Sequence, residues 1–109
     1  MLKVKVDTKN YTVTMRGHAD FAENGKDIVC AGASTLLYTL ANTLEEFRTA
    51  MTESPSFTIS GEGEKQRVTY RCKPNEEYEP NVQLVFMTVT TGFNLLAEKY
   101  PDNIKLTVI

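Results

Sequence analysis

The spacing of apolar residues switches between two periods along this chain, and this switching constrains the fold most. Residues 2–6 and 11–15 alternate between apolar and polar side chains, which is the two-residue period of half-buried strands. Residues 36–51 instead repeat apolar side chains every three or four positions, which is the period of one helical face. Both patterns recur further along the chain. The sequence therefore predicts strand pairs separated by helices.

The first half of the chain predicts a hairpin followed by a helix. Residues 8–10 are polar and would form the turn between the first two strands. The helix is expected to begin at Ile28, because Asp27 is a residue type that caps helix N-termini with its carboxylate. Its apolar stripe continues to Met51, and the helix is expected to end before the break at residues 54–56.

The second half repeats this pattern and adds one strand. The predicted elements are a hairpin over residues 57–72, a helix over residues 82–100 closed by Pro101, and a last strand over residues 104–108. The resulting order is ββαββαβ. Two such helices bury their apolar stripes most simply by covering one sheet, which predicts an α+β two-layer sandwich with a five-stranded mixed sheet. Residues 1–109 are expected to form a single domain, because the chain is about one domain long.

Composition and charge exclude several classes of function. No apolar run approaches the roughly 18 residues of a membrane span, and residues 1–7 lack the pattern of a secretory signal, so we expect a soluble, cytoplasmic protein without a membrane partner. The formal net charge is −2, so we expect no direct nucleic-acid ligand, although net charge leaves a local basic patch open. One histidine and two cysteines make a poor zinc site, and no metal or cofactor is expected.

The segment between the second strand and the first helix contains the residues that suggest chemistry. It starts with Gly17 and the chain's only histidine, His18, continues through a polar loop, and reaches Cys30 in the first helical turn. Unpaired N–H groups and the helix dipole favour an anion there. We therefore expect a thiolate whose pKa lies below the ordinary value of about 8.5, with His18 as its base. The same N–H groups would donate to the oxyanion formed during acyl transfer.

Several neighbours are expected to support catalysis or to bind substrate. Ser34 lies one helical turn after Cys30 on the same face. Gly17 and Gly25 are permissive backbone positions that would let the loop move, and Phe21 would be the apolar contact of that loop over a bound peptide. The supporting set comprises Gly17, Phe21, Gly25, Asp27, Ala31 and Ser34.

Spacing alone leaves plainer interpretations open. A lone cysteine near the start of an apolar helix is more often a small buried hydrophobe, and a histidine at a strand end is as often structural. For Asp27, helix capping is a better interpretation than contact with His18. Cys72 shares a strand face with Val68 and Tyr70, which predicts a packed thiol rather than a second nucleophile. Both cysteines are expected to be free thiols.

In residue type and spacing, this segment resembles the signature of the ribosomal-processing cysteine protease family, Prp. The matching positions are Gly17, His18, Ala19, Ala22, Gly25, Asp27, Val29, Cys30, Ala31, Gly32 and Ser34. A weaker likeness extends to the element order and to residues 98–101. The resemblance implies that Cys30 and His18 are the catalytic pair of a peptidase that needs no cofactor, and that the loop over residues 19–26 is a mobile substrate cover.

The resemblance also implies a substrate and an assembly. The family forms homodimers that remove the N-terminal extension of a large-subunit ribosomal protein precursor, cutting after aromatic and before small residues. This chain departs from the family pattern at Ala33 and Thr35 and shows little similarity over residues 52–81, which affects the choice of substrate more than the chemistry. Two alternatives stay open: a divergent paralogue that processes a phage or mobile-element structural protein, and a non-catalytic dimeric module that binds a ribosomal partner.

Overall fold

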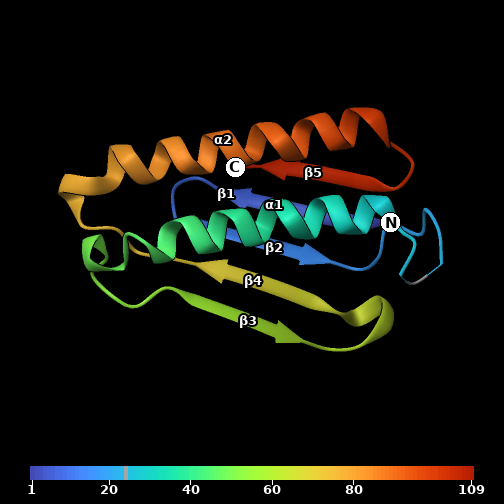
Figure 1. Cartoon of the computed structure of the whole chain (residues 1–109), viewed down its shortest axis with the longest axis horizontal. Helices are drawn as coiled ribbons and strands as arrows, with labels where there is room; N and C mark the ends of the chain where they lie inside the picture. The colour runs from blue at the N-terminus through green and yellow to red at the C-terminus, as the bar shows by residue number, and fades with distance from the viewer. Residues whose placement is uncertain (24) are drawn as a thin grey trace.

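A five-stranded sheet forms one layer of the molecule (Figure 1). The computed structural model describes residues 1–23 and 25–109, so position 24 of the expected loop lies outside the described residues. The strands are β1 (Leu2–Asp7), β2 (Thr12–Arg16), β3 (Ser56–Ser60), β4 (Arg67–Arg71) and β5 (Ile104–Val108). Their order across the sheet is β3-β4-β2-β1-β5.

The sheet is mixed because one of its strand pairs is parallel. β1 pairs with β5 in parallel, whereas β1 with β2, β2 with β4 and β3 with β4 are antiparallel. Residues 8–11 join the strands of the first hairpin and residues 61–66 those of the second, and the chain reaches β5 only after a long helix has carried it back along the sheet. The predicted order ββαββαβ and the five-stranded mixed sheet are therefore confirmed.

Two helices, α1 (Ile28–Glu45) and α2 (Glu79–Lys99), pack against each other over one face of the sheet (Figure 1). The core between the layers takes alternate residues of the strands and one stripe of each helix; its largest fully buried side chains include Val4, Val6, Val13, Leu37, Leu40, Leu44, Tyr70, Phe86, Phe93 and Ile104. The helices approach closely at Gly92, where an added Cβ would clash with the Leu36 side chain. A larger residue at that position would force the Leu36 side chain to move.

The first helix ends earlier than its apolar spacing predicts. α1 stops at Glu45, and a short 3-10 helix, η1 (Arg48–Ala50), follows it. Met51, the last residue of the predicted stripe, instead forms an isolated bridge with Pro74, and the Ala50 carbonyl accepts a hydrogen bond from Asn75 N–H at 2.8 Å. The chain turns here because its backbone pairs with the segment after β4, so the helical spacing of Met51 does not reflect helical structure.

The second helix matches its prediction and extends beyond it. α2 starts at Glu79, before its first buried residue Val82, because Pro80 fits the first turn, where an N–H group has no helical partner. It ends at Lys99, just before Pro101. Among the described residues, no helix has the length and apolar character needed to cross a membrane.

Candidate active site

Cys30 lies in the first turn of α1, as the sequence predicts, with its side chain half-buried. Asp27 caps this helix: its Oδ1 accepts hydrogen bonds from the N–H groups of Val29 and Cys30, each at 3.0 Å. The N–H of Ala31 donates to the Asp27 carbonyl, also at 3.0 Å. The capping role of Asp27 is therefore confirmed. These three N–H groups are already engaged, which corrects the expectation that they would receive a thiolate or an oxyanion.

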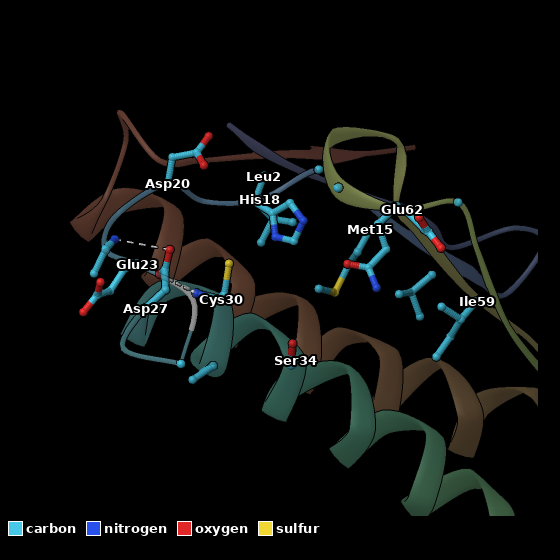
Figure 2. A pocket seen from close by; sticks show the side chains of 18 of the residues that line it. Leu2, Met15, His18, Asp20, Glu23, Asp27, Cys30, Ser34, Ile59 and Glu62 are labelled. Carbon is cyan, nitrogen blue, oxygen red and sulfur yellow. Dashed lines mark hydrogen bonds between the residues drawn. The ribbon is translucent and has the colours of Figure 1, made fainter.

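His18 enters the site through a sharp turn at the end of β2. Gly17 adopts φ +79°, and a Cβ there would lie 2.8 Å from the carbonyl oxygen of Met1. Only glycine combines this backbone conformation with so close a neighbour. After this turn, His18 and Cys30 line the same cavity (Figure 2).

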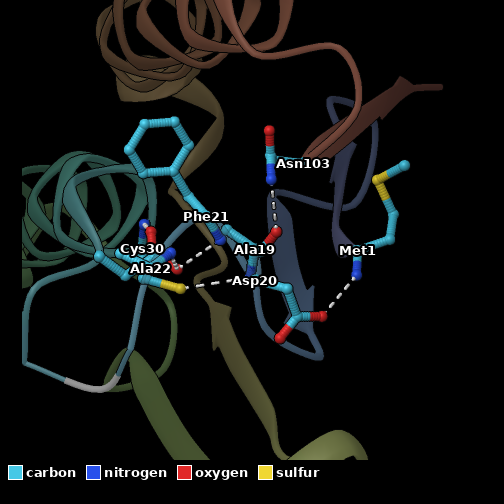
Figure 3. A network of polar contacts seen from close by, with 8 residues as sticks. Met1, Ala19, Asp20, Phe21, Ala22, Cys30 and Asn103 are labelled. Atoms are coloured by element: carbon cyan, nitrogen blue, oxygen red, sulfur yellow. Dashed lines mark hydrogen bonds and ion pairs between the residues drawn. The ribbon is translucent and has the colours of Figure 1, made fainter.

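Ala19, the residue after His18, contacts Cys30 through its backbone. Its N–H donates to Cys30 Sγ at 3.3 Å, and its carbonyl accepts a hydrogen bond from Asn103 Nδ2 at 3.0 Å (Figure 3). The Ala19 side chain is buried in the core. Asn103 sits in the turn between α2 and β5, far from the loop in sequence, so no local pattern pointed to it. Together these contacts hold one N–H group against the sulfur.

The second carboxylate oxygen of Asp27 holds the loop that follows Ala19. Oδ2 accepts hydrogen bonds from the N–H groups of Phe21 at 3.0 Å and Ala22 at 3.4 Å. Burial alone would raise the pKa of this carboxyl, but the backbone donors, that of Cys30 foremost, outweigh it and hold the pKa below its ordinary value. Asp27 thus joins the loop to the helix start. No hydrogen bond links it to His18 among the described residues.

The surroundings of Cys30 favour a neutral thiol in this structure. Burial raises the pKa of the Cys30 thiol above its ordinary value, and the N–H of Ala19 offsets only part of that effect. The carboxylates of Asp27 and Asp20 raise this pKa further because they repel a nearby thiolate. The expected lowering of the thiol pKa by the helix N-terminus is therefore wrong for this conformation. The main physical reason is burial of the thiol, and Asp27 adds to it by placing a negative charge at the same helix end.

The cavity that contains Cys30 and His18 has a volume of about 930 Å³ and two kinds of wall (Figure 2). Its apolar wall runs along the sheet and α1 and consists of Leu2, Met15, Tyr38, Ile59 and Val68. Among the described residues, its charged lining is acidic and consists of Asp20, Glu23, Asp27 and Glu62, with no lysine or arginine. Sequence reasoning did not assign the apolar wall, because its members come from five separate elements or loops.

The predicted supporting residues divide into two groups. Gly25, Ala31 and Ser34 line the cavity, but none of the hydrogen bonds recorded for the described residues joins Ser34 to Cys30. Phe21 lies outside the cavity lining and packs edge-on against Tyr100, with ring centroids 5.2 Å apart. The expected contact of Phe21 with a bound peptide therefore stays a prediction. In this structure, Phe21 anchors the loop to the end of α2.

Comparisons with known proteins agree on one family. Residues 1–105 match the family model described as cysteine protease Prp. The chain is 31% identical to the ribosomal processing cysteine protease Prp of Staphylococcus aureus strain Mu50, over 96% of this chain and 92% of that protein. It is also 31% identical to the protein of the same name from Mycoplasma genitalium, over 95% of this chain and 92% of that protein.

Solved structures show the same likeness. The crystal structure of the essential ribosomal processing protease Prp from S. aureus, in complex with a covalently linked product peptide, superimposes with a TM-score of 0.74 at 27% identity and full coverage of both chains. The structure of that protease with a substrate peptide gives a TM-score of 0.69. The match in sequence and in fold covers almost the whole chain, and the chain therefore belongs to the Prp family of cysteine proteases.

Proposed function

We propose that this protein is an endopeptidase in which Cys30 is the nucleophile and His18 is the general base. The observation that carries the proposal is the shared cavity: the sulfur at the start of α1 and the imidazole after β2 line one space, with the Ala19 N–H 3.3 Å from the sulfur. Because the pKa of the resting thiol is raised, the proton must be removed as the reaction begins. His18 is the chain's only imidazole and the base available for that step.

The reaction then proceeds as acyl transfer in two stages. His18 accepts the Cys30 proton, and the sulfur forms a bond to the scissile carbonyl carbon. The tetrahedral intermediate breaks its C–N bond, and the leaving amine takes the proton from His18. Water next attacks the thioester while His18 accepts one of its protons. The second tetrahedral intermediate then breaks its C–S bond, the carboxylic acid product leaves, and the thiolate recovers a proton from His18.

The oxyanion requires a donor close to the sulfur, and Ala19 N–H fits this role. The first-turn N–H groups of Val29 and Cys30 are already bonded to Asp27. Ala19 N–H instead points at Cys30 Sγ and is held there from both sides, by burial of its own side chain and by Asn103. When the sulfur bonds to carbon, its lone pairs become weaker acceptors, and this N–H can turn to the new oxyanion beside it.

The walls of the cavity define a substrate that is apolar at one position and basic near it. The apolar wall suits an aromatic side chain next to the scissile bond, and the acidic lining suits a peptide with lysine or arginine nearby. Ribosomal proteins are rich in such cations because they bind RNA phosphates. These features support removal of the N-terminal extension of a large-subunit ribosomal protein precursor, cut after an aromatic and before a small residue. The relatives in S. aureus and M. genitalium are named as ribosomal processing proteases, which agrees with this substrate.

The proposal is tested by incubating the purified chain with a ribosomal protein precursor and, separately, with a phage structural protein. Mass spectrometry of the new N-terminus should show one cut after an aromatic residue in the ribosomal precursor. The Cys30→Ala variant should leave that precursor intact. Selective cleavage of the phage protein would contradict the proposed substrate, and cleavage of neither protein would contradict the proposed activity.

The resemblance also supports a homodimer that works in the cytoplasm, where ribosomal proteins are made. Light scattering at micromolar concentration should give a mass near twice the 12.2 kDa of the chain. A mass equal to one chain at all concentrations would contradict the dimer. Fractionation of cells should place the protein with the soluble cytoplasmic proteins.

A further inference from the structure

A row of positive side chains crosses four strands on the sheet face that the helices leave open. Strand pairing sets Lys105 opposite Lys3, Lys3 opposite Arg16, and Arg16 opposite Arg67. All four residues are exposed and alternate with core residues along their strands. We call these four residues the basic row. Neighbouring strands lie about 4.8 Å apart, so the basic row spans roughly 14 Å.

The rest of this open face adds positive charge and hydroxyl groups. The next cross-strand row contains Thr107, Lys5, Thr14, Thr69 and Thr58, and the row after it contains Asp7, Thr12, Arg71 and Ser56. Six of the chain's 12 lysines and arginines therefore lie in these three rows, together with one carboxylate. A protein with net charge −2 thus has one strongly positive face.

The basic row is not neutralised within the chain. Like charges directly opposite each other across strands destabilise a sheet. None of the ion pairs found among residues 1–23 and 25–109 includes a member of the basic row, whereas Arg48 and Lys73 each pair with a glutamate. The fold therefore tolerates an unfavourable arrangement here, which an anionic partner would make favourable.

The chemistry of the face identifies the class of partner. Its side chains, as paired in the three rows, are Lys, Arg, Thr, Ser and Asp, and the exposed Ile109 lies beside them just after β5, so the face has one aliphatic side chain at its edge and no apolar centre. A protein partner needs an apolar centre to bind stably, and single-stranded RNA needs aromatic rings on which its bases stack. Cations and hydroxyl groups without either feature match the phosphates and 2′-hydroxyls of a nucleic-acid backbone. The same charges would repel a second copy of this face.

We propose that the open face of the sheet binds the backbone of double-stranded RNA through the basic row. This proposal reverses the expectation, drawn from net charge, that nucleic acid is not a direct ligand, because net charge conceals how the charges are distributed. The choice of RNA rests on the proposed ribosomal substrate. RNA binding would hold the protease next to ribosomal proteins before their extensions are removed.

The position of the basic row relative to the active site supports this arrangement. Arg16 immediately precedes Gly17 and His18, and Gly17 lines both the catalytic cavity and a hollow on the basic side that contains Lys3, Arg16 and Arg67. The two surfaces therefore meet at the end of β2. The charged groups on the catalytic side are acidic, whereas the hollow on the other side has four cations, Lys3, Arg16, Lys65 and Arg67, and one carboxylate, Glu64. RNA on the basic row would leave the catalytic cavity open to a basic peptide.

The test measures fluorescence anisotropy of a labelled RNA duplex against the whole protein over a range of salt concentrations. If four phosphates are contacted, the logarithm of the binding constant should fall with the logarithm of salt concentration with a slope of about −3 to −4. The variant Lys3→Gln, Arg16→Gln, Arg67→Gln should bind the duplex more than about tenfold more weakly. Its slope should be less negative by about three, because three cations are removed. Its melting temperature should not fall, because the substitutions remove repulsion.

A matched variant separates position from total charge. Arg48→Gln, Lys73→Gln, Lys99→Gln removes the same charge away from the open face and should bind the duplex like the unmodified protein. Equal weakening by both variants, tighter binding of poly-glutamate or of a DNA duplex than of RNA, or no salt-dependent binding would overturn the proposal. Cleavage of a free peptide by the basic-row variant should be unchanged, so failure of RNA binding is distinguishable from failure of the proposed protease activity.

Discussion

The two cysteines, Cys30 and Cys72, both touch the same core, yet they differ in what they can reach. Cys72 follows β4, is 4% exposed, and burial raises its pKa to about 11. Cys30 is half-buried, lines a large cavity, and accepts a hydrogen bond from the N–H of Ala19. Burial raises the pKa of Cys30 as well, but Ala19 offsets part of this effect. The sulfur of Cys72 is therefore buried in the core, whereas the sulfur of Cys30 faces a cavity that a peptide can enter.

This difference shows that the environment, and not the residue type, determines reactivity. Neither cysteine has a pKa lowered by its surroundings, so a helix N-terminus alone does not produce a thiolate here. Cys30 differs from Cys72 in two ways. It lines a cavity that a substrate can enter, and residues 17–19 place the His18 imidazole in that cavity and the Ala19 N–H against the Cys30 sulfur. The following changes test whether these properties separate the two cysteines.

The largest expected effect comes from removing each sulfur in turn. Cys30→Ala should lower kcat/KM for a precursor peptide by about 10⁴-fold or more, because loss of a nucleophile removes the covalent route. Cys72→Ala should keep kcat within about tenfold and lower the free energy of unfolding by about 1–2 kcal/mol, because it leaves a small cavity in the core. Peptide hydrolysis and urea unfolding measure the two effects. Loss of activity in Cys72→Ala alone would reverse the assignment.

Removing the imidazole should give the next largest effect. His18→Ala should lower kcat by about 10²–10⁴-fold, because the raised pKa of Cys30 makes assisted proton removal necessary. Free imidazole added to this variant should restore part of the activity, and it should not activate Cys30→Ala. An activity of His18→Ala equal to that of the unmodified protein would show that another group removes the proton.

Alkylation by iodoacetamide compares the two thiols directly. Cys30 should react at least about 100-fold faster than Cys72 at neutral pH, because only the thiolate reacts and only Cys30 is accessible. Since the pKa of Cys30 is raised, its rate should keep increasing with pH above the ordinary thiol pKa of about 8.5. In denaturant the two rates should become similar. A rate for Cys30 that is already constant at pH 7 would contradict the neutral resting thiol.

The smallest effect is expected from Asp27→Asn. This change keeps an oxygen acceptor for the helix N–H groups but removes the charge that raises the pKa of Cys30, so iodoacetamide should label Cys30 faster. It also weakens the contact with the loop, and the free energy of unfolding at pH 7 should fall by about 1 kcal/mol.

The pH dependence of this loss of stability has a definite sign. The pKa of Asp27 is lowered in the folded protein, so the stability that its carboxylate adds is present above the ordinary pKa of about 3.9. That contribution disappears as the pH falls through the lower, folded-state pKa. The difference in urea unfolding between the unmodified protein and Asp27→Asn should therefore shrink in acid. A difference that stays constant down to pH 2 would contradict the lowered pKa.

The sequence predicted most of the fold because the apolar period reports which face each element buries. It failed at Met51, whose helical spacing continues the stripe although its backbone pairs with Pro74. The spacing of apolar residues shows only where apolar side chains occur. It does not show that the backbone of Met51 pairs with a residue more than twenty positions further along the chain. The same limit explains why the sequence predicted a mixed sheet without assigning the parallel pairing of β1 with β5.

Local rules predicted parts of the geometry of the candidate site but not its electrostatics. Asp27 as the cap and Gly17 at a positive φ follow from local rules. The raised pKa of Cys30 does not, because it depends on burial and on where carboxylates settle after folding. The contact of Asn103 with Ala19 joins residues 84 positions apart, and no local pattern reports such a contact.

The most direct test of a nucleophilic Cys30 beside His18 is covalent capture with a peptide chloromethyl ketone that ends in an aromatic residue. Peptide mapping by mass spectrometry should find one adduct, on the sulfur of Cys30, formed quickly in the native protein and slowly in His18→Ala. An adduct on Cys72 in the folded protein, or capture of Cys30 at the same rate with and without His18, would contradict the proposed site.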